Sequence, residues 1–221
     1  MKPENQHWCE RWRENRIGFH SSDINQYLQK YLPNFALPDE AAVFLPLCGK
    51  SNDIAWLADQ GLNVIGVELS AIAIEAFFAE HELRYQSFES DRFVMRSCAN
   101  IKLLEGDYFE LNSDDLQGCA LVFDRASLIA LSAQQRVEYS RHLNAIMPPQ
   151  CNIFLVALDY DQQQMSGPPY AVTATEVAQY FGDDFAIIEL EKNDVLDELP
   201  RWREQGLTRL TETVYRLERK G

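Results

Sequence analysis

The sequence predicts an α/β fold, a single doubly wound and mostly parallel sheet of seven strands that ends in an antiparallel strand. Short apolar runs alternate with amphipathic helical patterns, which is typical of right-handed βαβ units. The last two strand-like runs have no long helix between them, so we expect them to pair antiparallel. No linker rich in Gly, Pro or Ser divides the 221 residues. We therefore expect one domain over residues 1–221.

Residues 1–35 are predicted to form a helical lid ahead of a sheet core over residues 36–221. Within this lid, the apolar positions of Ser22–Leu32 recur at helical spacing, and a proline follows the end of that helix. Trp8 and Trp12 are four residues apart, so we expect them on one helical face. Trp8 is interpreted as core packing.

The core is predicted from runs of Val, Ile, Leu and Phe that are short enough to be buried strands. The predicted strands cover residues 42–47, 63–69, 101–104, 120–124, 153–158, 185–190 and 213–217. The predicted helices cover residues 51–60, 71–83, 133–147 and 174–181. Ser70 is expected to cap the second of these helices, and Thr173 with Glu176 forms the pattern of a capping box for the last.

The composition is that of an ordinary folded protein with excess negative charge. Hydrophobic residues make up 46% and charged residues 24%, and 34 acidic against 20 basic residues give a net charge of −14. Such a field repels duplex nucleic acid and anionic membranes, so we expect neither as a partner.

The cysteines and the N-terminus indicate a cytoplasmic protein. The five cysteines are an odd number without CxxC spacing, which favours reduced thiols. The first residues lack the apolar core of a secretory signal, and no apolar run is long enough to span a bilayer. No cluster of His, Cys, Asp and Glu has metal-ligand spacing, so we expect no metal. We expect a monomer with a small-molecule substrate.

The ends of the first two strands are the first place to expect a ligand, because doubly wound sheets bind ligands beyond the carboxyl ends of their strands. The loop after the first strand contains only Gly49, so the G-x-G-x-x-G pattern of dinucleotide-binding folds is missing. Glu68 ends the second strand about 20 residues later, at the spacing of a carboxylate that accepts hydrogen bonds from ribose hydroxyls. The alternative is that Glu68 is an ordinary exposed carboxylate.

The ends of the third and fourth strands also carry candidate site residues. Asp107 and Tyr108 follow the third strand, where a short polar residue and an aromatic ring can contact adenine; the alternative is a simple turn. Arg125 ends the fourth strand, where a cation is costly unless a carboxylate or a ligand pairs with it. The alternative for Arg125 is an internal ion pair with Asp124.

Nearly the whole chain resembles one enzyme family, the thiopurine S-methyltransferases. The residues that carry the resemblance are WCERWRENRIGFH, FLPLCGKSNDIAWLADQGLNVIGVELSAIAIEAFF, FDRASLIAL, GPPYAV and GLTRLTETVYRLE. The resemblance implies a Rossmann-like fold and methyl transfer from S-adenosylmethionine, with S-adenosylhomocysteine as the product. The acceptor it implies is the sulfur of small aromatic or heterocyclic thiols such as thiopurines, or alternatively selenium or tellurium oxyanions.

The family's site residues can be carried over onto matching positions of this sequence. The resemblance implies cofactor contacts by Trp12, Leu47, Glu68, Asp107, Tyr108 and Arg125. It implies that Phe19 and Arg201 face the acceptor, although Arg201 lies in a segment slightly longer than the family's and also fits a solvated surface arginine. Arg125 is the one residue to which it assigns a catalytic role, at the meeting of cofactor and acceptor.

The resemblance implies in-line attack of the acceptor on the activated methyl group without an obligatory general base, because a heterocyclic thiol is substantially ionised near neutral pH. His20 is the one histidine close to the lid, and packing or hydrogen bonding explains it as well as a role as a base does. Cys48 has no activating base beside it in the sequence and is interpreted as an apolar filler. Two other functions stay open on the residues, a nicotinamide-dependent Rossmann oxidoreductase and a non-catalytic relative.

Overall fold

The apolar runs in the first half of the chain form a parallel sheet that can be buried on both faces. β1 (Ala42–Leu45), β2 (Asn63–Glu68) and β5 (Ile101–Glu105) pair in the order β5-β2-β1. Their carboxyl ends therefore lie along one edge of this sheet. The structure is a computed structural model, and it describes residues 3–221, with side chains from residue 5 onward.

A hairpin that the sequence did not reveal extends this sheet. β3 (Gln86–Glu89) pairs antiparallel with β4 (Val94–Cys98), and β4 pairs antiparallel with β5. The prediction of seven strands was therefore wrong, since the described residues contain nine. All four residues of β3 are exposed, so the strand has no apolar run that would reveal it.

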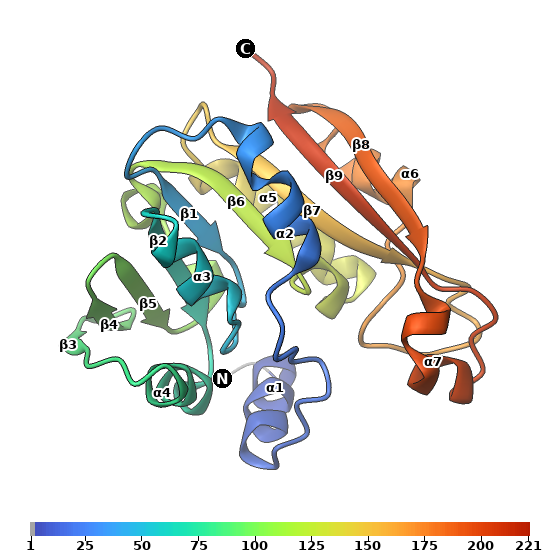
Figure 1. Cartoon of the computed structure of the whole chain (residues 1–221), viewed down its shortest axis with the longest axis horizontal. Coiled ribbons are helices and arrows are strands. Elements are labelled where there is room, and N and C mark those ends of the chain that lie inside the picture. The colour runs from blue at the N-terminus through green and yellow to red at the C-terminus, as the bar shows by residue number, and fades with distance from the viewer. Residues whose placement is uncertain (1–2) are drawn as a thin grey trace. The chain divides into compact units, whose positions relative to one another are not determined.

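The helices of this half pack around the parallel strands. They are α1 (Pro3–Arg13), α2 (Gln26–Tyr31), α3 (Asp53–Asp59) and α4 (Ala71–Glu80), and 3-10 turns cover Leu32–Phe35, Tyr108–Glu110 and Ser113–Leu116. Both α3 and α4 pack against β2, and α1 packs against α4 (Figure 1). α2 is shorter than predicted because Asn25 caps its start. The side-chain oxygen of Asn25 accepts hydrogen bonds from the backbone N–H groups of Tyr27 and Leu28.

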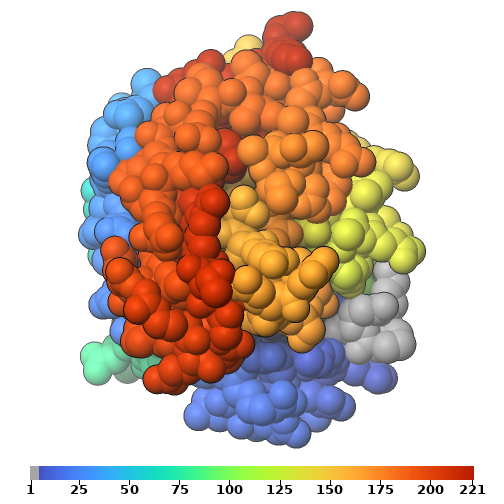
Figure 2. Space-filling view, turned by 90° about the vertical axis from the view of Figure 1, so that its right-hand side faces the viewer, coloured from blue at the N-terminus to red at the C-terminus, as the bar shows by residue number. Residues whose placement is uncertain are grey.

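The second half of the chain carries the predicted antiparallel ending. β6 (Cys119–Arg125) and β7 (Asn152–Asp159) are parallel, whereas β9 (Thr211–Arg219) is antiparallel to both β7 and β8 (Phe185–Asp194). The order within this half is β6-β7-β9-β8. In Figure 2, the residues from β8 to β9, coloured orange to red, cover much of the visible face of this half.

Three helices and two 3-10 turns complete the second half. The helices are α5 (Ala133–Ile146), α6 (Ala174–Phe181) and α7 (Pro200–Glu204), and the turns cover Leu128–Ala130 and Leu196–Glu198. The capping box of Thr173 and Glu176 is confirmed at the start of α6, and Ser132 forms a second one with Gln135 at α5. Ser70 lies at the cap position of α4, but its side chain accepts no capping hydrogen bond, so that prediction was wrong.

The chain clusters into two compact units, Met1–Ala120 and Leu121–Gly221. The prediction of one domain over residues 1–221, with a lid that ends at residue 35, stays a prediction. In the described part of the chain, no helix combines the length and the apolar character that a membrane crossing requires.

Candidate cofactor site

Glu68 is a buried carboxylate at the carboxyl end of β2, with 6% of its surface exposed, so it is not an ordinary exposed side chain. One carboxylate oxygen accepts a hydrogen bond from the N–H of Gly49 at 2.9 Å, and the other accepts from the N–H of Ser70 at 2.8 Å. Burial raises the pKa of Glu68, and these backbone donors act in the opposite direction. Glu68 therefore joins the loop after β1 to the start of α4.

The loop after β1 turns sharply although it has only one glycine. Leu47 and Gly49 both have a left-handed backbone, with φ of 45° and 54°. A left-handed leucine is a strained conformation that glycine would adopt freely, and such strain is concentrated at functional sites. Cys48 between them is buried, and burial followed by the charge of Glu68 raises the pKa of its thiol well above the usual value. Cys48 is therefore a neutral filler, as predicted.

Trp12 joins the N-terminal helix to this loop. Its side chain is 6% exposed, and a Cβ atom added to Gly49 would lie 3.1 Å from the indole Cζ2 atom. The ring of Phe19 packs edge-on against both Trp8 and Trp12, with ring centroids 5.5 Å apart in each pair. Trp8 packs against Phe19 in this aromatic cluster but is only half-buried, so the prediction that it packs in the core was wrong.

Asp107 lies just beyond the end of β5 and has two partners within the protein. Its carboxylate accepts hydrogen bonds from the backbone N–H of Phe109 at 3.0 Å and from the side-chain amide of Asn5 at 2.9 Å. Tyr108 beside it is buried, and its ring packs edge-on against Phe109. The segment is thus a capped 3-10 turn that is also tied to α1, which is more than a simple turn.

α1 presents three side chains to the carboxyl ends of these parallel strands. Asn5, Cys9 and Trp12 recur at helical spacing. The pKa of the Cys9 thiol is raised, first by burial and then by the negative charges of Glu68 and Glu105, while the charge of Arg13 acts in the opposite direction. Within one unit, Trp12 thus lies against Gly49 in the loop that contains Leu47, Gly49 binds Glu68, and Asn5 of α1 binds Asp107.

Arg125 and its neighbour Asp124 end β6 in the other unit. Asp124 is 1% exposed, and its carboxylate accepts hydrogen bonds from the hydroxyl of Tyr139 at 2.6 Å and from the N–H of Leu128 at 3.0 Å. Burial raises the pKa of Asp124, and its hydrogen bonds act in the opposite direction. Asp124 thus braces the turn that follows Arg125, and Arg125 itself is half-buried.

Arg201 lies on α7, a short helix on the surface of the second unit. Its side chain is exposed, and the guanidinium carbon stacks 4.9 Å from the ring centroid of Trp202. The structure thus leaves its predicted contact with the acceptor a prediction. Gln164 and Thr208 join the segment after β7 to the segment after α7 by hydrogen bonds of 3.0 to 3.3 Å.

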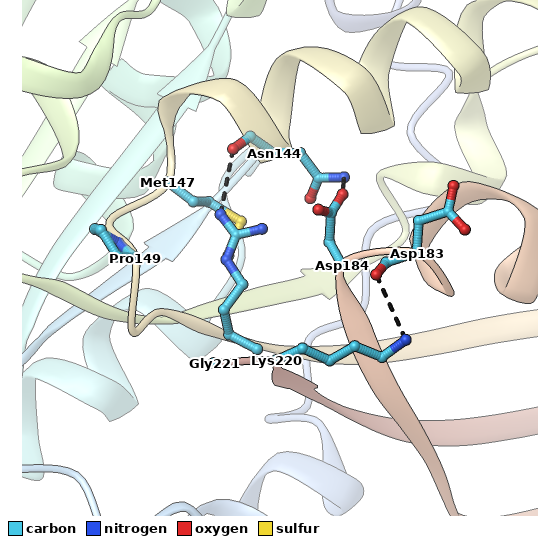
Figure 3. Close-up of a pocket in the computed structure, with 8 residues that line it drawn as sticks. Asn144, Met147, Pro149, Asp183, Asp184, Lys220 and Gly221 are labelled. Carbon is cyan, nitrogen blue, oxygen red and sulfur yellow. Dashed lines mark hydrogen bonds between the residues drawn. The ribbon is translucent and has the colours of Figure 1, made fainter.

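A polar hollow in the second unit contains none of the predicted site residues. Its lining residues are Asn144, Met147, Pro149, Asp183, Asp184, Arg219, Lys220 and Gly221. Figure 3 shows that the polar groups bind one another: Asn144 donates to Asp184 at 3.0 Å, and the ammonium of Lys220 donates to the carbonyl oxygen of Asp183. The hydrogen bonds around the hollow therefore join the ends of α5 and β9 to the turn before β8.

Sequence reasoning missed Asn5 and Arg96, which contact the candidate site. Asn5 is seven residues before Trp12, and this helical spacing is the signal that could have placed it on the same face of α1. Arg96 binds Glu105 from β4, and no signal could have revealed it without the hairpin. The described residues contain no group of three or more His, Cys, Asp and Glu side chains arranged to hold a metal ion.

Comparison with known proteins finds similar enzymes over nearly the whole chain. A family model described as thiopurine S-methyltransferase matches residues 3–220. A thiopurine S-methyltransferase of Pseudomonas fluorescens is 45% identical over 95% of this chain and 96% of its own length. The enzyme of the same name from Nitrosospira multiformis is 45% identical over 98% of both chains.

Solved structures show the same fold at low sequence identity. A SAM-dependent methyltransferase from Anabaena variabilis superposes with a TM-score of 0.71 at 15% identity, over all of this chain and 96% of its own. A Burkholderia thailandensis 1,6-didemethyltoxoflavin-N1-methyltransferase with bound S-adenosylhomocysteine gives 0.66 at 15% identity, over 98% of this chain and 87% of its own. The chain therefore belongs to the thiopurine S-methyltransferase family, a family of S-adenosylmethionine-dependent methyltransferases.

Proposed function

We propose that the protein transfers the methyl group of S-adenosylmethionine to the sulfur of small aromatic or heterocyclic thiols such as thiopurines. One observation carries the proposal. Two relatives that are 45% identical to this chain over nearly their full length are named thiopurine S-methyltransferases. Selenium or tellurium oxyanions are the alternative acceptors, and the same experiment tests them.

The donor and acceptor groups in the first unit fit this cofactor. Glu68 is buried and has two carboxylate oxygens, each with lone pairs beyond the one used by Gly49 or Ser70, so it can accept hydrogen bonds from both ribose hydroxyls. Asp107 can accept from the adenine amino group beside its bonds to Asn5 and Phe109. Trp12 and Leu47 supply apolar surface. When bound, the cofactor supplies a methyl group that its sulfonium already activates.

The protein itself then aligns the acceptor with the methyl group, excludes water from the site and stabilises the anionic form of the acceptor. Alignment of two reactants can contribute roughly 7–11 kcal/mol of the barrier. Arg125 favours a thiolate through a charge-assisted contact, and no residue needs to remove a proton from an acidic thiol. Phe19 and Arg201 are proposed to contact the acceptor. A rate that is flat between about pH 6 and pH 8 with an acidic thiol supports the reaction without a base.

The decisive experiment measures methyl transfer from labelled S-adenosylmethionine to a panel of heterocyclic thiols, selenite and tellurite. We expect kcat/KM to be highest for a thiol that is ionised at the assay pH. Turnover confined to selenite or tellurite would contradict the thiol proposal, and no turnover with any acceptor would favour a non-catalytic relative.

Two variants separate the proposed roles of Glu68 and Arg125. Glu68→Gln should weaken S-adenosylhomocysteine binding at least about tenfold, because bonds to a charged acceptor are worth roughly 1.5–3 kcal/mol each. Arg125→Ala should lower kcat/KM for the acceptor and change cofactor affinity much less. Isothermal titration calorimetry and initial rates measure the two effects, with the exposed Glu82→Gln as the control. Unchanged cofactor affinity in Glu68→Gln would refute the ribose assignment.

A further inference from the structure

The turn of the β3–β4 hairpin contacts residues 106–115, the segment that contains Asp107. The side chain of Arg92 donates to the carbonyl oxygen of Glu110 at 2.6 Å and binds Asp115 through two hydrogen bonds, at 2.7 and 3.1 Å. A Cβ atom added to Gly106 would lie only 2.4 Å from the ring of Phe93. The hairpin therefore contacts the 106–115 segment at both of its ends.

A third contact from the hairpin is an ion pair with the end of β5. The guanidinium of Arg96 on β4 donates to Glu105 at 2.5 Å, and its other nitrogen reaches Glu75 on α4 at 3.5 Å. Only 8% of Arg96 is exposed, whereas the side chain of Glu75 is 59% exposed. Because exposed pairs contribute little, the bond to Glu105 is the stronger of the two.

Glu105 in turn is the neighbour of the proposed ribose ligand. Glu68 and Glu105 stand opposite each other in the parallel register of β2 and β5. This register places two acidic residues side by side, and a cation that compensates one negative charge favours the ionised form of a neighbouring one. Arg96 is hydrogen-bonded to Glu105, and Glu68 accepts hydrogen bonds from the backbone of Gly49 and Ser70. Burial and the charge of Glu68 raise the pKa values of the thiols of Cys9 on α1 and Cys48 in the first loop.

We propose that Arg96 is a positioning residue for the cofactor site, which keeps Glu68 ionised by neutralising Glu105 and holds the end of β5 in place. This inference rests on the proposed role of Glu68 as the ribose ligand. It makes the hairpin a determinant of cofactor affinity, although neither β3 nor β4 contributes a predicted cofactor contact.

The test is S-adenosylhomocysteine binding, measured by calorimetry from about pH 5 to pH 8. Arg96→Gln should weaken binding about tenfold, which corresponds to about 1.4 kcal/mol. It should also move the pH at which binding is lost to a higher value, because an unpaired Glu105 makes Glu68 easier to protonate. Arg96→Lys keeps the charge and should restore most of the affinity. Arg84→Gln removes the same charge from an exposed site just before the hairpin and should behave as the parent protein does.

A double variant keeps the test valid if Arg96→Gln folds poorly. Arg96→Gln with Glu105→Gln has no unpaired carboxylate, and we expect its binding to be lost at or below the pH at which the parent protein loses it. Equal affinities and pH profiles for Arg96→Gln and Arg84→Gln would overturn the inference. If Glu68→Gln still weakens binding in that case, the ribose assignment stands and only the role of Arg96 fails.

Discussion

Glu68 and Asp124 are two buried carboxylates that end strands and organise the loops after them. Glu68 accepts hydrogen bonds from the backbone on both of its oxygens, and Asp124 accepts them from Tyr139 and Leu128. Each carboxylate thus satisfies a backbone N–H group just beyond the end of its own strand, that of Ser70 for Glu68 and that of Leu128 for Asp124. Since burial raises both pKa values, both residues also make the folded state sensitive to pH.

Asp124→Asn should change the pH dependence of stability in a defined direction. A carboxylate whose pKa is raised in the folded state contributes stability that is present below its unfolded pKa, about 3.9, and lost as the pH rises through the folded pKa. Relative to the variant, the parent protein should therefore lose stability as the pH rises from about 4 toward neutrality. Urea unfolding at a series of pH values measures this difference.

Asp115→Asn is the matched control with the opposite sign. The bonds from Arg92 and from the backbone of Asn112 outweigh burial and lower the pKa of Asp115. Its contribution is present above the unfolded pKa and lost as the pH falls through the folded pKa. The stability of the parent protein relative to this variant should therefore fall as the pH drops below about 4. If the difference in stability from the parent protein changed with pH in the same direction for both variants, the opposite pKa shifts of Asp124 and Asp115 would be refuted.

At the scale of elements, the start of α4 differs from the start of α6. Thr173 accepts a hydrogen bond from the N–H of Glu176 at 3.2 Å, whereas Ser70 makes no side-chain cap. Thr173→Ala should therefore lower the free energy of unfolding by about 1 kcal/mol, and Ser70→Ala should lower it by clearly less. Thermal and urea unfolding measure both. A larger loss in Ser70→Ala would mean that Ser70 does cap α4.

The contrast between β2 and β3 shows which elements the sequence reveals. β2 has five buried residues out of six, so its apolar run is visible without any structure. β3 is an exposed edge strand whose partner is a neighbouring strand, and its residues Gln86–Glu89 carry no periodic signal. Helix types were predicted better than helix ends, because a cap such as Asn25 depends on local hydrogen bonds.

The residues of the candidate site also divide into those that the sequence reveals and those that depend on how the elements pack. Glu68 could be recognised as a candidate because it ends an apolar strand at a recognisable distance from Gly49. Asn5 and Arg96 could not, because their roles depend on how α1 and the hairpin pack against the ends of β2 and β5. Leu47 was carried over by resemblance alone, and its left-handed backbone is a property that only the structure reveals.

On the scale of the whole molecule, the two compact units should unfold together. The boundary between Ala120 and Leu121 falls inside β6, and one continuous strand leaves no linker to separate them. In Trp202→Phe the remaining tryptophans, Trp8, Trp12 and Trp56, all report on the first unit. Urea unfolding of this variant should give one midpoint by tryptophan fluorescence and by far-ultraviolet circular dichroism. Two separate midpoints would contradict the prediction of a single domain.

The net charge of −14 gives a prediction about the acceptor. A thiolate that approaches the protein is repelled by the whole negative field, whereas its proposed contact with the half-buried Arg125 is short-ranged and would be screened less. The Debye length shrinks from about 30 Å at 0.01 M salt to about 8 Å at 0.15 M, so salt should weaken the repulsion more than the contact. The KM for an anionic thiol should therefore fall as salt rises, in initial-rate assays at saturating S-adenosylmethionine.

The same thiol below its own pKa is neutral and serves as the control, and its KM should change little. A KM that rises with salt for the anion would mean that local attraction outweighs the net charge, with Arg125→Ala then expected to abolish the salt dependence.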